Sequence, residues 1–269
     1  MINFKLQHID SVAPAGSTGD YSMSWFWLTE ADLWLKFDRA TIYEYSPEAM
    51  EYFGDKPTPY NDYPLVRYIE DFTELFGIIN ESIPDKLYEI VEDLEGFYFD
   101  AEKWYDIIDP DEEEIDEESF RLYTILRSWA YERSFDSGHL TGGPTISFFR
   151  NNDKIKIVWK VNHKLENGID LWTAKDGFTE MEYPDFIEKV KEFGVQFFRE
   201  MDNQVNLAID KDWKDIKIDK VRLKEEHKER KEDFYHQLDL LEGKPENKTD
   251  WIQVINLLER MKEEIKTKA

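Results

Sequence analysis

Apolar side chains alternate with other residues in two neighbouring runs, Ile146 to Arg150 and Ile155 to Trp159. A period of two is the spacing of a strand with one buried face. Between the runs stand Asn151, Asn152 and Asp153, residue types that favour tight turns. We therefore predict a β-hairpin here. Its inward face includes Ile146, Phe148, Ile155, Ile157 and Trp159.

Apolar positions three and four residues apart predict helices elsewhere in the chain. The segments with this spacing are Leu65 to Ile79, Ile83 to Leu94, Phe97 to Ile108, Phe120 to Arg133 and Tyr183 to Met201. Gly96 is expected to separate the Ile83 to Leu94 helix from the Phe97 to Ile108 helix. Gly138 is expected to end the helix before the hairpin with a positive φ angle. Ser46 followed by Pro47 predicts a further helix start.

Short aromatic or β-branched runs predict the remaining strands. Three of them, Met23 to Leu28, Leu33 to Phe37 and Thr41 to Tyr45, suggest an N-terminal meander, and Ile169 to Thr173 and Phe178 to Met181 follow the hairpin. The pattern predicts an α+β fold in which an antiparallel sheet, made of the meander and the central hairpin, packs with several helices.

The last part of the chain has a different composition. Residues 210–269 hold 16 acidic and 15 basic residues, with apolar stripes that predict two antiparallel helices. We therefore divide the chain into an α+β domain, 1–207, and a C-terminal helical hairpin or extension, 208–269. The hairpin either packs on the main domain or projects from it. A chain ending near Val205 or Asp210 is expected to remain folded.

Composition excludes several classes of site and location. The chain of 269 residues has no cysteine, so it has no disulfide and no thiolate zinc site. Its five histidines form no HExxH pair, and no nucleotide fingerprint is present, so we expect no metal and no cofactor. No run approaches 18 apolar residues and no leader segment is visible. We expect a cytoplasmic protein.

The formal net charge of −25 is concentrated in one segment, because residues 48–120 hold 24 acidic and 4 basic residues. Such a field disfavours nucleic acid and anionic membranes and favours a basic protein partner. The candidate contact is the densest acidic run, which consists of Asp109, Asp111, Glu112, Glu113, Glu114, Asp116, Glu117 and Glu118. The alternative is that this acidity only keeps the protein soluble.

A second candidate is a polar pocket near the hairpin, made of Arg127, Arg133, Asp136, His139 and Arg150. His139 and Asp136 have the chemistry of a general base and its orienting carboxylate. The structural alternative is that Asp136 caps a turn and the arginines pair with the acidic helices. The adjoining Thr141 to Pro144 segment, Thr-Gly-Gly-Pro, precedes a strand and lacks a phosphate-loop pattern, which favours a structural turn.

These motifs carry a resemblance to a known family. The Ser24 to Thr29 segment (SWFWLT), the Phe135 to Pro144 run (FDSGHLTGGP), the hairpin, and the Trp172 to Gly177 segment followed by a helix resemble an uncharacterised bacterial family, a domain of unknown function. The resemblance spans roughly residues 1–205. It implies a common fold unit and carries no activity.

We therefore expect a cytosolic bacterial interaction protein that neutralises a partner, most specifically an immunity protein that binds a toxin through its acidic surface. One alternative is a phosphate-mimicking inhibitor of a nucleic-acid-binding defence protein, which would present carboxylates at phosphate-like spacing. Another is a small-ligand binder or enzyme that uses the central Arg/Asp/His cluster, which would require a concave pocket there. The sequence does not distinguish these hypotheses, and it favours an interaction protein over an enzyme.

Overall fold

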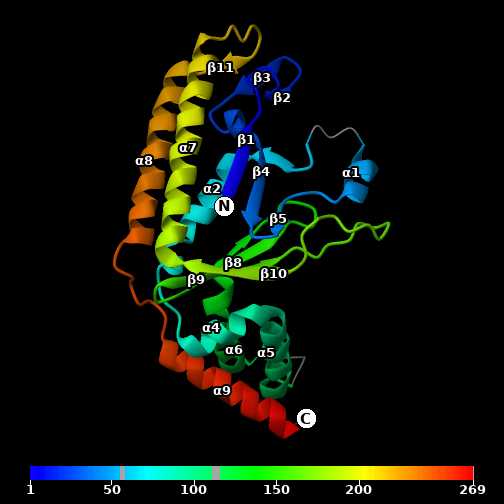
Figure 1. Cartoon of the computed structure of the whole chain (residues 1–269), viewed down its shortest axis with the longest axis vertical. Helices are drawn as coiled ribbons and strands as arrows, with labels where there is room; N and C mark the ends of the chain where they lie inside the picture. Colours follow the sequence, from blue (N-terminus) through cyan, green and yellow to red (C-terminus); the bar gives the residue numbers. More distant parts are fainter. Residues whose placement is uncertain (55–57, 111–115, 269) are drawn as a thin grey trace.

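A four-stranded antiparallel sheet crosses the middle of the molecule and separates two hydrophobic cores (Figure 1). The computed structural model describes residues 1–54, 58–110 and 116–268. The strands of this central sheet, in spatial order, are β10 (Gly177–Glu182), β9 (Lys154–Lys160), β8 (Thr145–Asn151) and β7 (Ser134–Asp136). Strands β8 and β9 form the predicted hairpin, in which Ile146 pairs with Trp159 and Phe148 with Ile157.

The two faces of the central sheet contact different cores. Ile146, Phe148 and Ile157 point into the main core, whereas Phe149 and Val158 belong to the second core on the other face. Both faces are therefore covered, which explains why neighbouring residues of β8 and β9 are buried together.

The N-terminal strands form two further sheets. One contains β1 (Ile2–Leu6), β4 (Glu30–Phe37), β5 (Ala40–Ile42) and β6 (Asn61–Pro64), all in antiparallel pairs. The other contains β2 (Ala15–Ser17), β3 (Asp20–Met23) and β11 (Lys217–Ile218), and β11 runs parallel to β3. The meander and the central hairpin thus belong to separate sheets, which meet across the main core where Phe37 stacks on Trp159 with ring centroids 5.2 Å apart.

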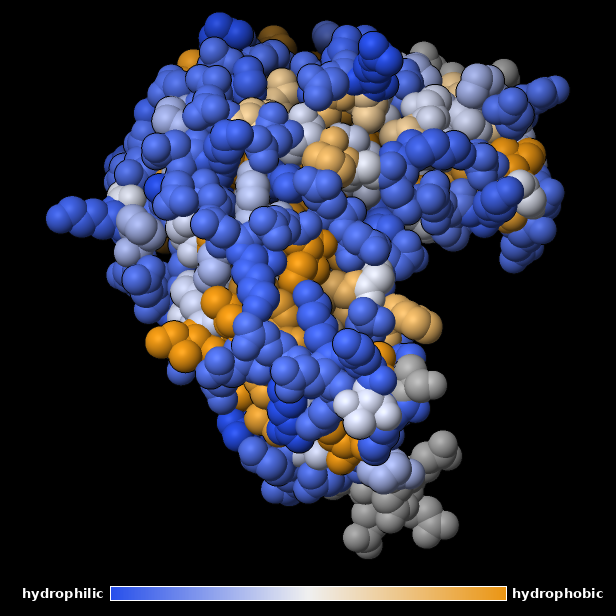
Figure 2. Space-filling model, turned by 60° about the horizontal axis from the view of Figure 1, so that its bottom comes forward, coloured by the Kyte–Doolittle hydropathy of each residue, from blue (hydrophilic) through white to orange (hydrophobic). Residues whose placement is uncertain are grey.

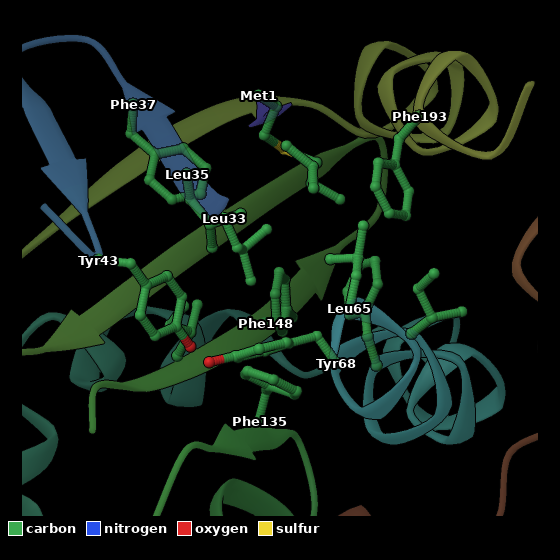
Figure 3. A pocket seen from close by; sticks show the side chains of 14 residues that line it. Met1, Leu33, Leu35, Phe37, Tyr43, Leu65, Tyr68, Phe135, Phe148 and Phe193 are labelled. Carbon is green, nitrogen blue, oxygen red and sulfur yellow. The ribbon is translucent and has the colours of Figure 1, made fainter. Parts of the chain in front are cut away.

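A small apolar cavity of about 40 Å³ lies between these two sheets (Figure 3). Side chains from β4, α2 and the central sheet surround it, including Leu33, Leu35, Tyr68 and Phe148. The Phe193 ring closes one side from α7. An apolar lining of this kind keeps a cavity dry, so we treat it as part of the core.

The helices form two groups. The first group covers the main core and consists of α2 (Leu65–Glu74), α3 (Phe76–Ile79), α7 (Tyr183–Asp210) and α8 (Lys220–Glu242). The second group, which we call the helical layer, consists of α4 (Asp85–Ile90), the short 3-10 helix η2 (Val91–Asp93), α5 (Leu94–Ile108), α6 (Glu117–Tyr131) and α9 (Trp251–Lys268). Helix α1 (Pro47–Phe53) lies apart from both groups, and its cap is the predicted Ser46, which accepts a hydrogen bond from the Ala49 amide.

The two C-terminal helices pack on different parts of the body. Helix α8 lies along α7 and also contacts α2 and α3, whereas α9 packs on α5 and α6 (Figure 1). The sequence predicts that these two helices pair as a hairpin. Their apolar stripes instead face two separate cores, with Phe234, Leu238 and Leu241 in the main core and Val254, Leu258 and Met261 in the second.

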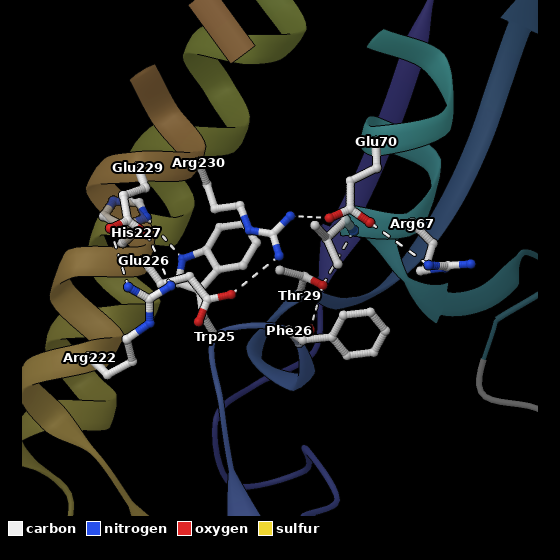
Figure 4. A network of polar contacts seen from close by, with 11 residues as sticks. Trp25, Phe26, Thr29, Arg67, Glu70, Arg222, Glu226, His227, Glu229 and Arg230 are labelled. Atoms are coloured by element: carbon white, nitrogen blue, oxygen red, sulfur yellow. Dashed lines mark hydrogen bonds and ion pairs between the residues drawn. The ribbon is translucent and has the colours of Figure 1, made fainter. Parts of the chain in front are cut away.

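A partly buried polar network fixes α8 (Figure 4). The indole N–H of Trp25 donates to Nδ1 of His227 at 3.1 Å, and Nε2 of His227 lies 2.7 Å from a carboxylate oxygen of Asp202 on α7. Arg230 bonds to Glu70 of α2 and places its guanidinium over the Trp25 ring. These bonds explain how a strongly charged helix is held against the core.

Four local predictions require correction. The segment from Met23 to Leu28 is not a strand, because β3 ends at Met23 and a 3-10 helix, η1 (Trp27–Thr29), follows. The Ile169 to Thr173 segment has only isolated bridges, and its Trp172 stacks on Tyr45 and donates to the Gly142 carbonyl. Gly96 lies inside the first turn of α5, where its amide donates to the Asp93 cap. Gly142, and not Gly138, has the positive φ angle, 63°.

Candidate partner-binding face

The helical layer is held to the central sheet by its apolar side. Trp104 of α5, Leu126 and Trp129 of α6, and Leu258 of α9 are fully or almost fully buried in the second core. The indole N–H of Trp104 donates to Glu264 at 2.8 Å, which ties α5 to α9. The opposite sides of α5 and α6 are left to face solvent.

A row of stacked side chains runs along the seam between α5 and α6, where Tyr98 and Tyr123 are partly buried against the second core. Tyr105 stacks on Tyr123 with centroids 4.7 Å apart and meets Phe120 edge-on at 6.4 Å. The Arg127 guanidinium lies 4.8 Å from the Tyr123 ring and 5.1 Å from the Tyr98 ring. We call Tyr98, Tyr105, Phe120, Tyr123 and Arg127 the aromatic strip. Phe120 is 51% exposed, so the strip begins at the surface.

Carboxylates border the aromatic strip. Glu102 and Asp106 of α5 are exposed. Burial raises the pKa of Tyr123, Arg127 acts in the opposite direction, and the charges of Glu102 and Asp106 add to the rise. Residues 85–109 and 116–132 together carry thirteen acidic and four basic residues, a net charge of −9. Figure 2 shows apolar side chains gathered among hydrophilic ones over the lower part of the molecule, where the helical layer lies.

The described members of the predicted acidic run, Asp109, Asp116, Glu117 and Glu118, lie at the Phe120 end of the strip. Asp111, Glu112, Glu113 and Glu114 fall outside the described residues. Of the others, Asp109 accepts hydrogen bonds from the Tyr105 hydroxyl and the Asp116 amide. Asp116 caps α6 through the Ser119 amide, and Glu118 pairs with Arg121. These bonds lower the pKa of Asp116 and of Glu118. Glu117 is exposed in the first turn of α6.

A cleft of about 760 Å³ opens at the other end of the strip, between the helical layer and β7. Tyr98 and Tyr131 line it from the helices, and Ser134, Asp136, Thr145 and Ser147 line it from the sheet. Gly142 and Gly143 are also part of the lining. A Cβ atom at Gly142 would lie 2.3 Å from the His163 ring, and one at Gly143 would lie 1.9 Å from the Ser137 carbonyl oxygen. The two glycines are therefore needed for a close structural turn.

The five residues of the predicted polar pocket lie in separate surroundings. Arg133 is fully buried and pairs with Glu81, with Nη2 and Oε2 2.8 Å apart. Arg150 donates to the Asn80 carbonyl at 2.8 Å and lies over the Tyr183 ring. Arg133 and Arg150 thus anchor the adjacent residues Asn80 and Glu81, which lie in the segment between α3 and α4.

Asn80 and Glu81 in turn hold the segment that joins α8 to α9. The Asn80 amide donates to the Leu240 and Gly243 carbonyls at 2.8 and 3.0 Å. Glu81 accepts hydrogen bonds from the amides of Lys248 and Thr249 and from the Thr249 hydroxyl. This cluster has a structural role.

The remaining members of the predicted pocket are closer to solvent. Arg127 belongs to the aromatic strip, and Asp136 lines the cleft and accepts from Thr145 at 3.4 Å. His139 lies against Tyr63 and Tyr68, with ring centroids 4.8 and 5.6 Å away, and partial burial lowers the pKa of this histidine. Asp136 and His139 are both described, and no hydrogen bond joins them in the structure. A general base with its orienting carboxylate is therefore not assembled.

The sequence reasoning missed the aromatic strip. Phe120, Tyr123 and Arg127 follow one another at intervals of three and four on α6, the spacing of one helix face, so the α6 part of the strip could have been predicted from the sequence. The contribution of Tyr98 and Tyr105 depends on how α5 packs against α6, which no local pattern encodes. The role of Glu81 could not be predicted from local sequence, because its ion-pair partner Arg133 lies 52 residues away.

The described part of the chain contains no group of three or more His, Asp or Glu side chains able to hold a metal ion. Among the helices of that part, none combines the length and apolarity needed to span a bilayer.

Comparisons with known proteins identify the family. Neither the curated proteins nor the solved structures contain a match to this chain. A family model described as "Family of unknown function (DUF5984)" matches residues 1–257. The match extends into the first part of α9, beyond the limit near residue 205 expected from the motifs, so α8 and the start of α9 are part of the family's unit. The chain belongs to this family of unknown function, DUF5984.

Proposed function

We propose that this protein is an interaction protein that binds a basic protein partner through the outer side of α5 and α6 and neutralises it. The most specific form of the proposal is an immunity protein that masks a toxin. One observation carries it: an aromatic strip lies within an acidic border on a single face, from Phe120 to Tyr98.

The two components of this face have complementary tasks. Tyrosine, phenylalanine and arginine are enriched among the residues that anchor protein interfaces, because they bury large areas and still offer polar atoms. Carboxylates around such anchors attract a basic partner and speed its association. Lysine and arginine side chains also bind the faces of aromatic rings. The face therefore suits a basic protein better than a neutral one.

The test compares two variants that remove the same amount of charge from different surfaces. The first is Glu102→Gln/Asp106→Asn/Glu117→Gln, on the border of the strip. The control is Glu48→Gln/Glu51→Gln/Glu192→Gln, on α1 and α7, where all three side chains are exposed. A basic protein captured from the source cytosol by the unmodified chain serves as the ligand for kinetic measurements over a salt series.

We expect the border variant to associate about tenfold more slowly than the control at low salt, with a shallower salt dependence. If the captured partner is a toxin, co-expression of the unmodified chain or the control rescues growth, and the border variant rescues it less well. Equal association of both variants at low salt would contradict the proposal, because the border would then act only as a solubilising surface.

A further inference from the structure

We propose that the cleft between the helical layer and β7 receives an arginine side chain of the protein partner. This inference rests on the proposed function and specifies how the acidic face recognises its ligand. The cleft adjoins the aromatic strip at Tyr98, so a partner lying along the strip reaches it. Its chemistry is that of a site for a donor-rich, planar cation.

The floor of the cleft presents acceptors. The Ser134 hydroxyl donates to the Ala130 carbonyl at 3.2 Å, so in the 2.8 Å contact between Ser134 and Ser147 the proton comes from Ser147. Thr145 donates to Asp136. Each hydroxyl has one proton, and all three protons are committed within the protein. The lone pairs that remain match a guanidinium, which has five N–H donors and no acceptor.

Two carboxylates of the cleft, those of Glu132 and Asp136, form no ion pair with a lysine or arginine of the described residues and are therefore available to a ligand. Lys160 is held by Glu95 at 2.7 Å and by Asp176 at 3.3 Å. Asp176 also accepts from the amides of Val161 and Asn162, and these bonds lower its pKa although burial acts in the opposite direction. Among the described residues, no lysine or arginine lies within ion-pair distance of the exposed Glu132 and Asp136.

The walls distinguish a guanidinium from an ammonium. Tyr131 is 68% exposed and Tyr98 lines the same cleft. Burial raises the pKa of Tyr98 to about 12, so its phenol stays neutral. Arginine stacks on such rings and also bonds to carboxylates in a bidentate manner, whereas lysine offers a compact charge. Within the protein, the Arg127 guanidinium lies 5.1 Å from the Tyr98 ring, so this ring already contacts a group of the proposed kind.

The test uses an oligoarginine peptide as the probe, with an oligolysine peptide of equal length and free arginine for comparison. Calorimetric titrations compare Glu132→Gln/Asp136→Asn with Glu48→Gln/Glu51→Gln, an equal charge change on α1. They also compare Tyr131→Ala with Tyr52→Ala, since Tyr52 is a similarly exposed tyrosine, 59% exposed, on α1. All four variants change exposed side chains, so the fold is retained.

We expect the oligoarginine peptide to bind more tightly than the oligolysine peptide. Its affinity should fall about tenfold in Glu132→Gln/Asp136→Asn and in Tyr131→Ala, and less than about twofold in the two controls. Equal losses in cleft and control variants would overturn the inference, since general charge attraction would explain the binding. Free arginine binding as tightly as the peptide would also overturn it, because the cleft would then serve a small ligand.

The two proposals fail in different ways. If association of the partner depends on Glu102, Asp106 and Glu117 but peptide binding is unchanged by the cleft substitutions, only the arginine site is refuted. If the cleft binds the oligoarginine peptide as expected but the border substitutions do not change the association of any basic protein, only the proposed function is refuted.

Discussion

The buried ion pair between Arg133 and Glu81 joins three parts of the chain at the scale of single residues. Arg133 follows α6, Glu81 precedes α4, and the Thr249 hydroxyl that donates to Glu81 precedes α9. The Arg133 guanidinium also donates to the Trp129 carbonyl at 2.6 Å and lies over the Trp251 ring. Neither charge reaches solvent, so each depends on the other.

Removing one partner of such a pair leaves the other charge buried and unpaired. We therefore predict that Arg133→Met lowers the free energy of unfolding by about 3–5 kcal/mol in urea melts. Arg121→Met, whose partner Glu118 is exposed, should cost less than about 1 kcal/mol. Similar costs for the two variants would mean that water reaches Glu81 in the folded protein.

At the scale of elements, the β8–β9 hairpin carries the contact between the sheets. Trp159 is 5% exposed, stacks on Phe37, and donates its indole N–H to the Lys175 carbonyl at 2.9 Å. Phe178, on the neighbouring strand β10, points to the other face and is 45% exposed. The two positions form a matched pair for truncation.

We predict that Trp159→Ala lowers the free energy of unfolding by about 3–5 kcal/mol, because a large aromatic side chain leaves a cavity in the core. Phe178→Ala should cost less than about 1 kcal/mol. Both values come from denaturant melts of otherwise identical chains. A loss below about 1 kcal/mol for Trp159→Ala would place its ring outside the core and contradict the contact between the sheets.

Elements with a strong local pattern were predictable from the sequence. The hairpin alternates over two full strands, and α7 repeats apolar residues over several turns, so both are confirmed. The Met23 to Leu28 segment is rich in aromatic residues but shows no strand or helix periodicity. Its Trp25 forms a hydrogen bond with His227, which is more than 200 residues away in the sequence, and no local pattern encodes such a contact. The acidic segment was visible as charge, whereas the aromatic strip depends on the packing of α5 against α6.

At the scale of the whole molecule, the C-terminal helices complete both cores. Phe234 of α8 meets Phe198 of α7 with ring centroids 5.5 Å apart, and Gly194 of α7 allows this approach because a Cβ there would lie 2.2 Å from the Phe234 ring. Helix α9 covers the second core with Val254, Leu258 and Met261. From the sequence alone we expect residues 1–207 to fold by themselves, and the packing now argues for the opposite outcome.

We predict that a chain ending at Asp210 loses its cooperative thermal melt and aggregates. Its loss of α8 and α9 exposes apolar surface of both cores and removes the Lys248 and Thr249 donors that satisfy the buried Glu81. The control is a chain ending at Ile265, which retains the Glu264 acceptor of Trp104 and should melt like the full chain. Calorimetry and light scattering provide the measurements.

If the chain ending at Asp210 melts cooperatively as a monomer, residues 1–207 are an independent domain and α8 and α9 are attachments to it. Aggregation with an unchanged control would instead make the two helices part of a single folding unit, as the family match to residue 257 also suggests.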